Sequence, residues 1–488
     1  MPNARRTNFQ RIIHFVNIAL FIIVLLFLFS DTSKKISLFG RNFTISFWVS
    51  LVSIPLFVFS YFFIYKTRIL NRIASKLLFT FGILLFSSLA MALLLTPSYC
   101  GFGGEHPALV VIKESIKYIY DIALFLYFLF FIRFFSKKQL SIYVYGLIVC
   151  WIIVAGAQFI VYLAPKSFFA VLYDKIDFLD ILVDSSLIDR ARYEGFRLYS
   201  FLSEPSVNCV FINTFALPFL LLKTFKSKGR TLSFFTNLTL TIIVTAGTLL
   251  TKSSSVYITF FAFVASAMYL FLKKSSLSKK IKITIVACIG VFIAFLFVVP
   301  TTRNLIVYYA VNKIFNLSNL STAYRYSTVY NDLLILIKFP LFGCGDGNQG
   351  FFYFQHVAGT KMTVSYETVN SLTFKQGLLN GGALIPSLIS GFGLFGIVLI
   401  ILLFKNYFLL FKKQPLYEDS LYTLLLYVCF ISVFVAGTVA IGIHRNFPLL
   451  FFLATPCINP NASNKIENLL YPIVGKKQYR IRYYSIKI

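Results

Sequence analysis

The segment 190–206 gathers residue types that suit chemistry on a phosphate. It carries Arg192, Arg197 and Glu204, with Tyr199 between the second arginine and the glutamate. Arginine binds phosphate oxygens through paired N–H groups, and a carboxylate can take the proton of an attacking hydroxyl. The same residues also suit a structural role, because the proline that follows favours the first turn of a helix and an Arg–Glu pair can stabilise its start.

A second polar region lies between residues 301 and 382. It contains Tyr324 and Arg325, a helical-looking run to Lys338, and a glycine string at 343–347 whose glycines allow tight turns. Without a preceding strand, this string does not indicate a dinucleotide site. Further polar residues that suit substrate contacts are His356, Glu367 and Asn370. A single loop histidine is more often a bystander than a base, so both roles stay open for it.

The short polar turn 251–255 separates two apolar runs and contains Lys252. A lysine near a membrane surface can extend its ammonium toward water along its apolar stem. It can equally contact a phosphate, because the turn is predicted to lie on the same side of the membrane as the two polar regions. Both roles remain open.

Neither a metal nor a cofactor is expected. The seven cysteines are scattered singly, and none forms a CxxC pair or a Cys/His spacing typical of a metal site.

The composition excludes an ordinary soluble enzyme. Hydrophobic residues make up 58% of the 488 residues and charged residues only 13%, and the mean hydropathy is +0.79. Soluble domains are about 45–50% apolar and about 25% charged. In a soluble protein the net charge of +29 would suggest nucleic acid. In a chain this apolar it indicates membrane topology instead, so the expected partner is a lipid bilayer and no nucleic acid.

The elements that must position these residues are membrane-spanning helices. A span needs about 20 mostly apolar residues. The sequence predicts an all-α polytopic integral membrane protein with about 12 such helices. The runs are 12–30, 43–65, 77–97, 118–135, 140–164, 205–222, 232–250, 255–272, 283–300, 383–404 and 420–442, with a short one at 448–458.

Basic residues set the predicted orientation. With the N-terminus inside, every short inside loop carries at least three lysines or arginines, as the positive-inside rule requires. Both termini are therefore expected in the cytoplasm. The predicted organisation is spans one to five in 1–164, a first long extracytoplasmic loop in 165–204, spans in 205–300, a second long extracytoplasmic loop in 301–382, spans ten to twelve in 383–460 and a basic cytoplasmic tail in 461–488.

Four pieces of sequence together resemble the O-antigen and capsular polysaccharide repeat-unit polymerases (Wzy-type), within the O-antigen polymerase/ligase family. They are Arg197 through Glu204-Pro205-Ser206 before a span, the turn 251–255 between two spans, Arg325 followed by Pro340 and the glycine string, and Asn370-Ser371 followed by Gly391-Phe-Gly393-Leu-Phe-Gly396. Their order and spacing agree over about residues 190–405. Many relatives carry Ser-Arg in the turn, where this chain has Lys252.

The resemblance implies a metal-independent, GT-C-like glycosyltransferase without a cofactor in the bacterial plasma (inner) membrane. Such an enzyme transfers a growing glycan from undecaprenyl pyrophosphate to a hydroxyl of the next lipid-linked repeat unit, on the outer face. A chain-length regulator and a flippase are the implied protein partners. Arg197 and Arg325, with Arg192 and Lys252, would hold the pyrophosphate, and Glu204 would be the base, with Glu367 or His356 as substitutes. Tyr199, Tyr324 and Phe352 would line the sugar path.

Two alternatives stay open. The first is an O-antigen ligase, which transfers glycan to a lipid core. Related ligases carry a histidine near the Asn-containing stretch, and here Val369 precedes Asn370, which argues against a ligase. The second is a lipid-linked oligosaccharide transporter or flippase. The sequence shows few charges in mid-span and no internal symmetry, which argues against a transporter built on repeats.

Overall fold

The computed structural model is a mostly helical protein. It describes residues 2–27, 36–38, 41–43, 45–61, 68–95, 106–164, 197–198, 200, 208–227, 231–274, 290, 294, 298–308, 312, 316, 320–357 and 384–411. Among these described residues, four helices are long and apolar enough to cross a membrane, at 74–95, 138–163, 232–250 and 385–403. The fold is therefore that of an all-α membrane protein.

Most of the described helices overlap the predicted apolar runs, whereas α13, α15 and α16 fall almost entirely in the predicted second long loop. In chain order they are α1 (Pro2–Phe27), α2 (Ile45–Ser60), α3 (Arg68–Leu95), α4 (Pro107–Phe131), α5 (Lys137–Leu163), the π-helix η5 (Cys209–Ala216), α9 (Leu217–Lys226), α10 (Thr231–Leu250), α11 (Ser254–Lys274), α13 (Pro300–Val307), α15 (Leu320–Lys338), α16 (Gln349–Val357) and α18 (Leu384–Phe411). The predicted helical run ending at Lys338 is confirmed as α15. The predicted spans 420–442 and 448–458 lie outside the described residues, as does most of 283–300.

One small element departs from the all-helical expectation. The strands β1 (Ile36–Leu38) and β2 (Arg41–Phe43) pair antiparallel, with Ile36 opposite Phe43. The predicted run 43–65 correspondingly begins its helix at Ile45. Three-residue strands are at the short end of the usual strand length, and alternating polarity over so few residues gives little signal in a sequence.

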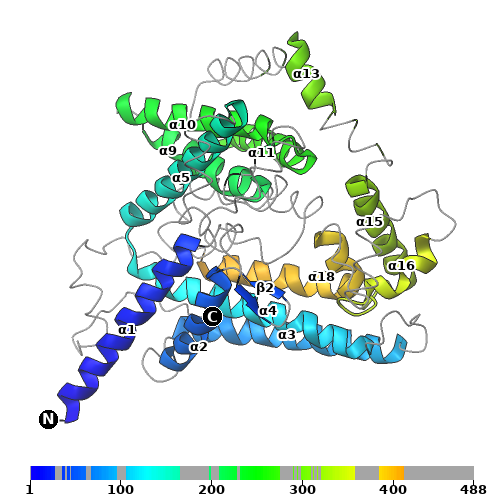
Figure 1. The fold of residues 1–488 in the computed structure, drawn as a ribbon. Helices are drawn as coiled ribbons and strands as arrows, with labels where there is room; N and C mark the ends of the chain where they lie inside the picture. The colour runs from blue at the N-terminus through cyan, green and yellow to red at the C-terminus, as the bar shows by residue number, and fades with distance from the viewer. Residues whose placement is uncertain are drawn as a thin grey trace.

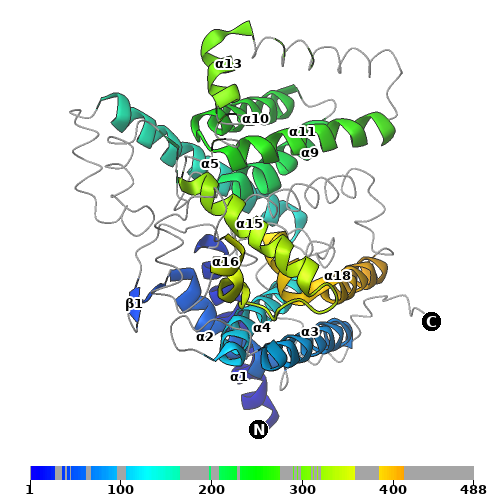
Figure 2. The ribbon, with the colours of Figure 1, turned by 90° about the vertical axis from the view of Figure 1, so that its right-hand side faces the viewer.

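Two helix groups make up most of the described structure. The N-terminal group contains α1 to α4 and α18, in which α3 packs against α4 and α18. The central group contains α5, η5, α9, α10 and α11, in which α10 packs against α9. Helix α15 runs between the two groups, from the ends of α10 and α11 to α16 and α18 (Figures 1 and 2). It is therefore placed to join features that lie far apart in the sequence.

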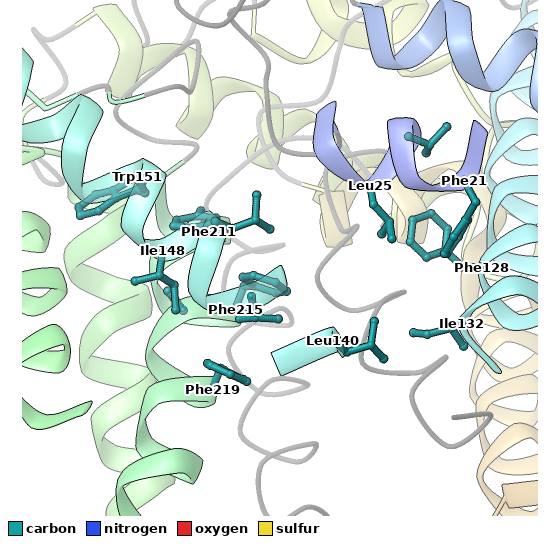
Figure 3. Close-up of a cluster of buried hydrophobic side chains, with 14 of the residues drawn as sticks. Phe21, Leu25, Phe128, Ile132, Leu140, Ile148, Trp151, Phe211, Phe215 and Phe219 are labelled. Atoms are coloured by element: carbon teal, nitrogen blue, oxygen red, sulfur yellow. The ribbon is translucent and has the colours of Figure 1, made fainter. Parts of the chain in front are cut away.

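Aromatic side chains dominate the core of both groups. Phe21 of α1 contacts Tyr127, Phe128 and Phe131 of α4 at ring-centroid distances of 5.3 to 5.5 Å. Trp151 of α5 stacks on Phe211 of η5, so the cluster continues into the central group (Figure 3). Aromatic pairs at these distances stabilise a core beyond the area that they bury.

Trp151 also fixes the approach of α5 to α10. A Cβ atom added to Gly247 of α10 would lie 2.3 Å from the Trp151 ring. The Trp151 Nε1 group donates to the Oδ1 atom of Asn208 at 3.0 Å. The missing side chain at Gly247 thus lets a buried tryptophan reach a polar partner, and both features hold the end of α10 near the segment around residue 200.

Candidate functional site

Leu198 and Ser200, which follow Arg197, form a strap that lies beside the end of α10. The backbone N–H of Leu198 donates to the carbonyl of Leu250 at 3.0 Å. The Asn208 side chain donates to the Leu198 carbonyl at 3.1 Å. Ser200 is fully buried, and its hydroxyl donates to the carbonyl of Trp151 at 3.0 Å. Arg197, which precedes these bonds, is partly buried. Its backbone is therefore held directly beside the turn that follows Leu250.

The turn after Leu250 leads straight into the first turn of α11. Lys252 has a left-handed backbone with φ of 47°, which side chains with a Cβ atom adopt at a steric cost. Asn213 of η5 stabilises the start of α11, because its Nδ2 group donates to Val256 O at 3.0 Å and to Thr259 Oγ1 at 2.7 Å. The π-helix thus supplies a polar side chain to the start of α11. Such helices often occur at functional sites.

The N-terminus of α11 has the features of an anion-binding site. The first N–H groups of a helix have no partner within the helix, and the helix dipole favours negative charge there. Ser254, at this end, is 8% exposed, and its Oγ atom has no hydrogen-bond partner among the described residues. A buried hydroxyl without a partner is unfavourable unless a ligand or water satisfies it.

Arg325 of α15 reaches this helix end. Its Nη1 group donates to the Ser255 Oγ atom at 3.4 Å. Three predicted site segments, which carry Arg197, Lys252 and Arg325, therefore meet around the first turn of α11. We call this the cationic junction. The predicted residue Tyr324, next to Arg325, is partly buried on the same helix.

The glycine string docks onto a break in α18. Gly393 interrupts the helix with φ of 65°. The carbonyls of Ser390 and Gly391 accept from Cys344 and Gly345, while the N–H groups of Leu394 and Phe395 donate to Pro340 and Leu341, all between 2.9 and 3.1 Å. In a regular helix these carbonyls and N–H groups would pair with each other. The loop that contains the glycine string thus replaces two hydrogen bonds of α18 with four hydrogen bonds between the loop and α18. It brings the motif around Pro340 and the glycine string next to the motif Gly391–Gly396.

A buried carboxyl group lies beside this docking. Asp332 of α15 is 4% exposed, and its Oδ1 atom accepts the Ser390 hydroxyl at 2.8 Å. Its Oδ2 atom has no hydrogen-bond partner among the described residues. Burial raises the pKa of Asp332 to about 7, an effect that the Ser390 hydrogen bond only partly opposes. This carboxyl group therefore keeps its proton to a higher pH than an ordinary aspartate does.

His356 of α16 is oriented by α15. Its Nδ1 atom lies 2.8 Å from the Asn331 Oδ1 atom, and the Asn331 Nδ2 group donates to the Gln349 carbonyl at 3.0 Å. Because the amide oxygen can only accept, Nδ1 of His356 carries the proton and Nε2 is the acceptor of the neutral ring. Burial, and then Lys338, lower the pKa of His356 below its usual 6.5. The side chain is therefore a neutral acceptor near pH 7.

Several predicted residues cannot be placed. Glu204, Arg192, Tyr199, Glu367 and Asn370 lie outside the described residues. The expectation that Phe352 lines a sugar path is wrong. Phe352 is fully buried, stacks on His356 and lies beneath the Lys338 ammonium. Phe351 and Tyr353, on either side of it, are also buried, and the sequence of a short helix does not show this without the fold.

Reasoning from the sequence also missed buried polar residues that organise the site. They are Gln158, Asn208, Asn213, Ser254 and Asp332. Gln158 and the two asparagines lie inside predicted spans, where polar side chains are costly and are usually paired or functional. That signal could have identified them.

Replacing Asp332 with asparagine should change how stability depends on pH. The pKa of Asp332 is raised on folding. The contribution of this carboxyl group to the free energy of unfolding is therefore fully present below its pKa in the unfolded chain, near 4, and is lost as the pH rises toward 7. The loss is about 1.4 kcal/mol per pH unit across that window. We expect the variant to unfold at a higher temperature than the parent at pH 8, and the difference to shrink at pH 5. The measurement is thermal unfolding in detergent. If the parent protein unfolded at the same temperature at both pH values, this prediction would be contradicted.

Among the described residues, no group of three or more His, Cys, Asp or Glu side chains could hold a metal ion. The arrangement instead offers cations, a helix N-terminus and a neutral histidine. No protein-family model matches the chain, and no curated protein matches it either.

Proposed function

We propose that this protein polymerises undecaprenyl-pyrophosphate-linked oligosaccharide repeat units into an O-antigen or capsule-type polysaccharide. The observation that carries the proposal is the cationic junction. Arg325 contacts Ser255, while the strap that follows Arg197 is bonded to Leu250, just before the turn that holds Lys252. Three separate segments that each carry a cationic residue thus come together near one helix N-terminus.

A pyrophosphate leaving group suits this junction. Its departure leaves negative charge on the phosphate oxygens, and fixed donors aimed at that charge lower the barrier. Arginine offers paired N–H groups, lysine offers a compact charge, and the α11 terminus offers backbone N–H groups and the Ser254 hydroxyl. In the reaction, the acceptor hydroxyl bonds to the anomeric carbon and the bond to the pyrophosphate oxygen breaks.

The hydroxyl proton requires a base. Glu204 is our first choice, because it belongs to the same segment as Arg197. His356 is the second choice, since its Nε2 atom is an acceptor when the ring is neutral. We further propose about 12 spans, a GT-C-like arrangement, both termini in the cytoplasm of a bacterial cell, and catalysis at the outer face of the plasma membrane.

Deleting the gene for this protein separates the candidate functions. Loss of a polymerase should leave glycans of a single repeat unit, because those units are still made and transferred onward. Loss of a ligase should leave no glycan on the lipid core, and loss of a flippase should keep the lipid-linked units on the inner face. Normal long chains in the deletion strain would contradict the proposal, and complementation with the wild-type gene is the control.

A further inference from the structure

Gln158 is a buried amide that uses both ends of its side chain on one residue. It lies in α5 and is 4% exposed. Its Oε1 atom accepts the Ser200 N–H at 2.7 Å, and its Nε2 group donates to the Ser200 carbonyl at 3.0 Å. A side chain that satisfies both backbone groups of one residue fixes the position of that residue and its orientation together.

Ser200 needs such support, because its backbone is left-handed. Its φ is 52°, and among the described residues the other non-glycine position with positive φ is Lys252, at 47°. Leu198 and Leu250 are joined by a backbone hydrogen bond, and Ser200 and Lys252 each follow one of these two residues by two positions. Residues with a Cβ atom avoid the left-handed backbone conformation because of steric repulsion. They keep it where contacts with the surrounding structure hold them there, which is often at functional sites.

We infer that Gln158 is a positioning residue for Arg197. The amide holds Ser200 in its left-handed turn, and this turn directs the strap so that Leu198 reaches Leu250 and Arg197 takes its place in the cationic junction. Gln158 itself does not contact the substrate. The inference rests on the proposed function, in that Arg197 is taken to bind the pyrophosphate.

The alternative is that Gln158 serves only to pack α5 against its neighbours. The backbone conformation of Ser200 separates the two. Glycine adopts positive φ without a steric penalty, whereas alanine does not. If the role of Gln158 is to hold a left-handed turn, glycine at position 200 should replace part of that role and alanine should not. Both substitutions remove the same Ser200 hydroxyl, so they form a matched pair.

The test uses full-length protein in detergent, with inorganic pyrophosphate as the probe. Gln158→Met conserves side-chain volume and removes both hydrogen bonds. We expect it to weaken pyrophosphate binding about tenfold. Adding Ser200→Gly should recover about fivefold of that loss, and adding Ser200→Ala should recover none. With Gln158 present, the glycine and alanine variants should differ little from each other, because the amide supports either one.

The outcomes are separable. If glycine and alanine behave alike in the Gln158→Met background, or if wild-type protein does not bind pyrophosphate, the inference is overturned. If the predicted series appears in binding but wild-type protein extends no glycan chains, the positioning role stands and the proposed function fails. If Gln158→Met does not fold, the test compares the yields of folded Gln158→Met/Ser200→Gly and Gln158→Met/Ser200→Ala. Equal yields would contradict the inference that Gln158 holds residue 200 in a left-handed conformation.

Discussion

Replacing Arg325 with alanine should reduce chain extension about 100- to 1,000-fold, because removing one fixed donor from a developing negative charge has effects of this size. Arg325 is the residue of the second predicted loop that reaches the α11 N-terminus, at 3.4 Å from Ser255. Arg325→Lys should retain part of the activity, because it keeps the charge and loses the paired N–H groups. The measurement is the length of the glycan chains made by cells that carry each variant.

Arg303 provides the matched control for this experiment. It is an exposed arginine of α13 in the same predicted loop. Arg303→Ala should leave chain length near that of the wild type. Equal losses for Arg303→Ala and Arg325→Ala would mean that only the total charge of the loop matters, and the assignment of Arg325 would be wrong.

Replacing Gly343 with alanine should destabilise the protein by at least about 3 kcal/mol. Gly343 has φ of 69°, and a Cβ atom there would lie 2.4 Å from the Ser390 carbonyl oxygen. Both the loop and α18 present backbone at this contact, so neither can move aside cheaply. Relieving the clash would separate the loop from α18 and break the four hydrogen bonds that join them. Thermal unfolding of the purified variant in detergent measures this loss.

Gly82 in α3 is the control for Gly343. A Cβ atom at Gly82 would meet nothing within 4 Å, and alanine is favoured over glycine in a helix by up to about 1 kcal/mol. Gly82→Ala should therefore unfold at the same temperature as the parent or slightly higher. If Gly343→Ala were as stable as Gly82→Ala, the docking of the glycine string onto α18 would be contradicted.

The helices could be predicted from the sequence because apolar length is a strong and local signal. The runs 77–97, 140–164, 232–250 and 383–404 correspond to the four helices in the described part of the chain that are long and apolar enough to cross a membrane. The helix that carries Arg325 could also be foreseen, as could the tight turns of the glycine string, whose three glycines have φ between 69° and 86°. Each of these features depends mainly on neighbours in the sequence.

The contacts between motifs could not be predicted. The pairing of the glycine string with Gly391 and the contact of Arg325 with Ser255 join residues that are far apart in the chain. Nor could the left-handed backbone of Lys252 be foreseen, since lysine has no preference for it. Such features depend on how whole helices pack, and the local pattern does not contain that information.

The most direct test of the central claim is reconstitution of the purified full-length protein in vesicles. The substrate is the lipid-pyrophosphate-linked repeat unit that accumulates in the deletion strain, supplied without any other enzyme. The proposal predicts glycan chains of many units, with one lipid pyrophosphate released for each linkage formed, and none of this with Arg325→Ala. Unchanged single units in the presence of folded wild-type protein would contradict the claim.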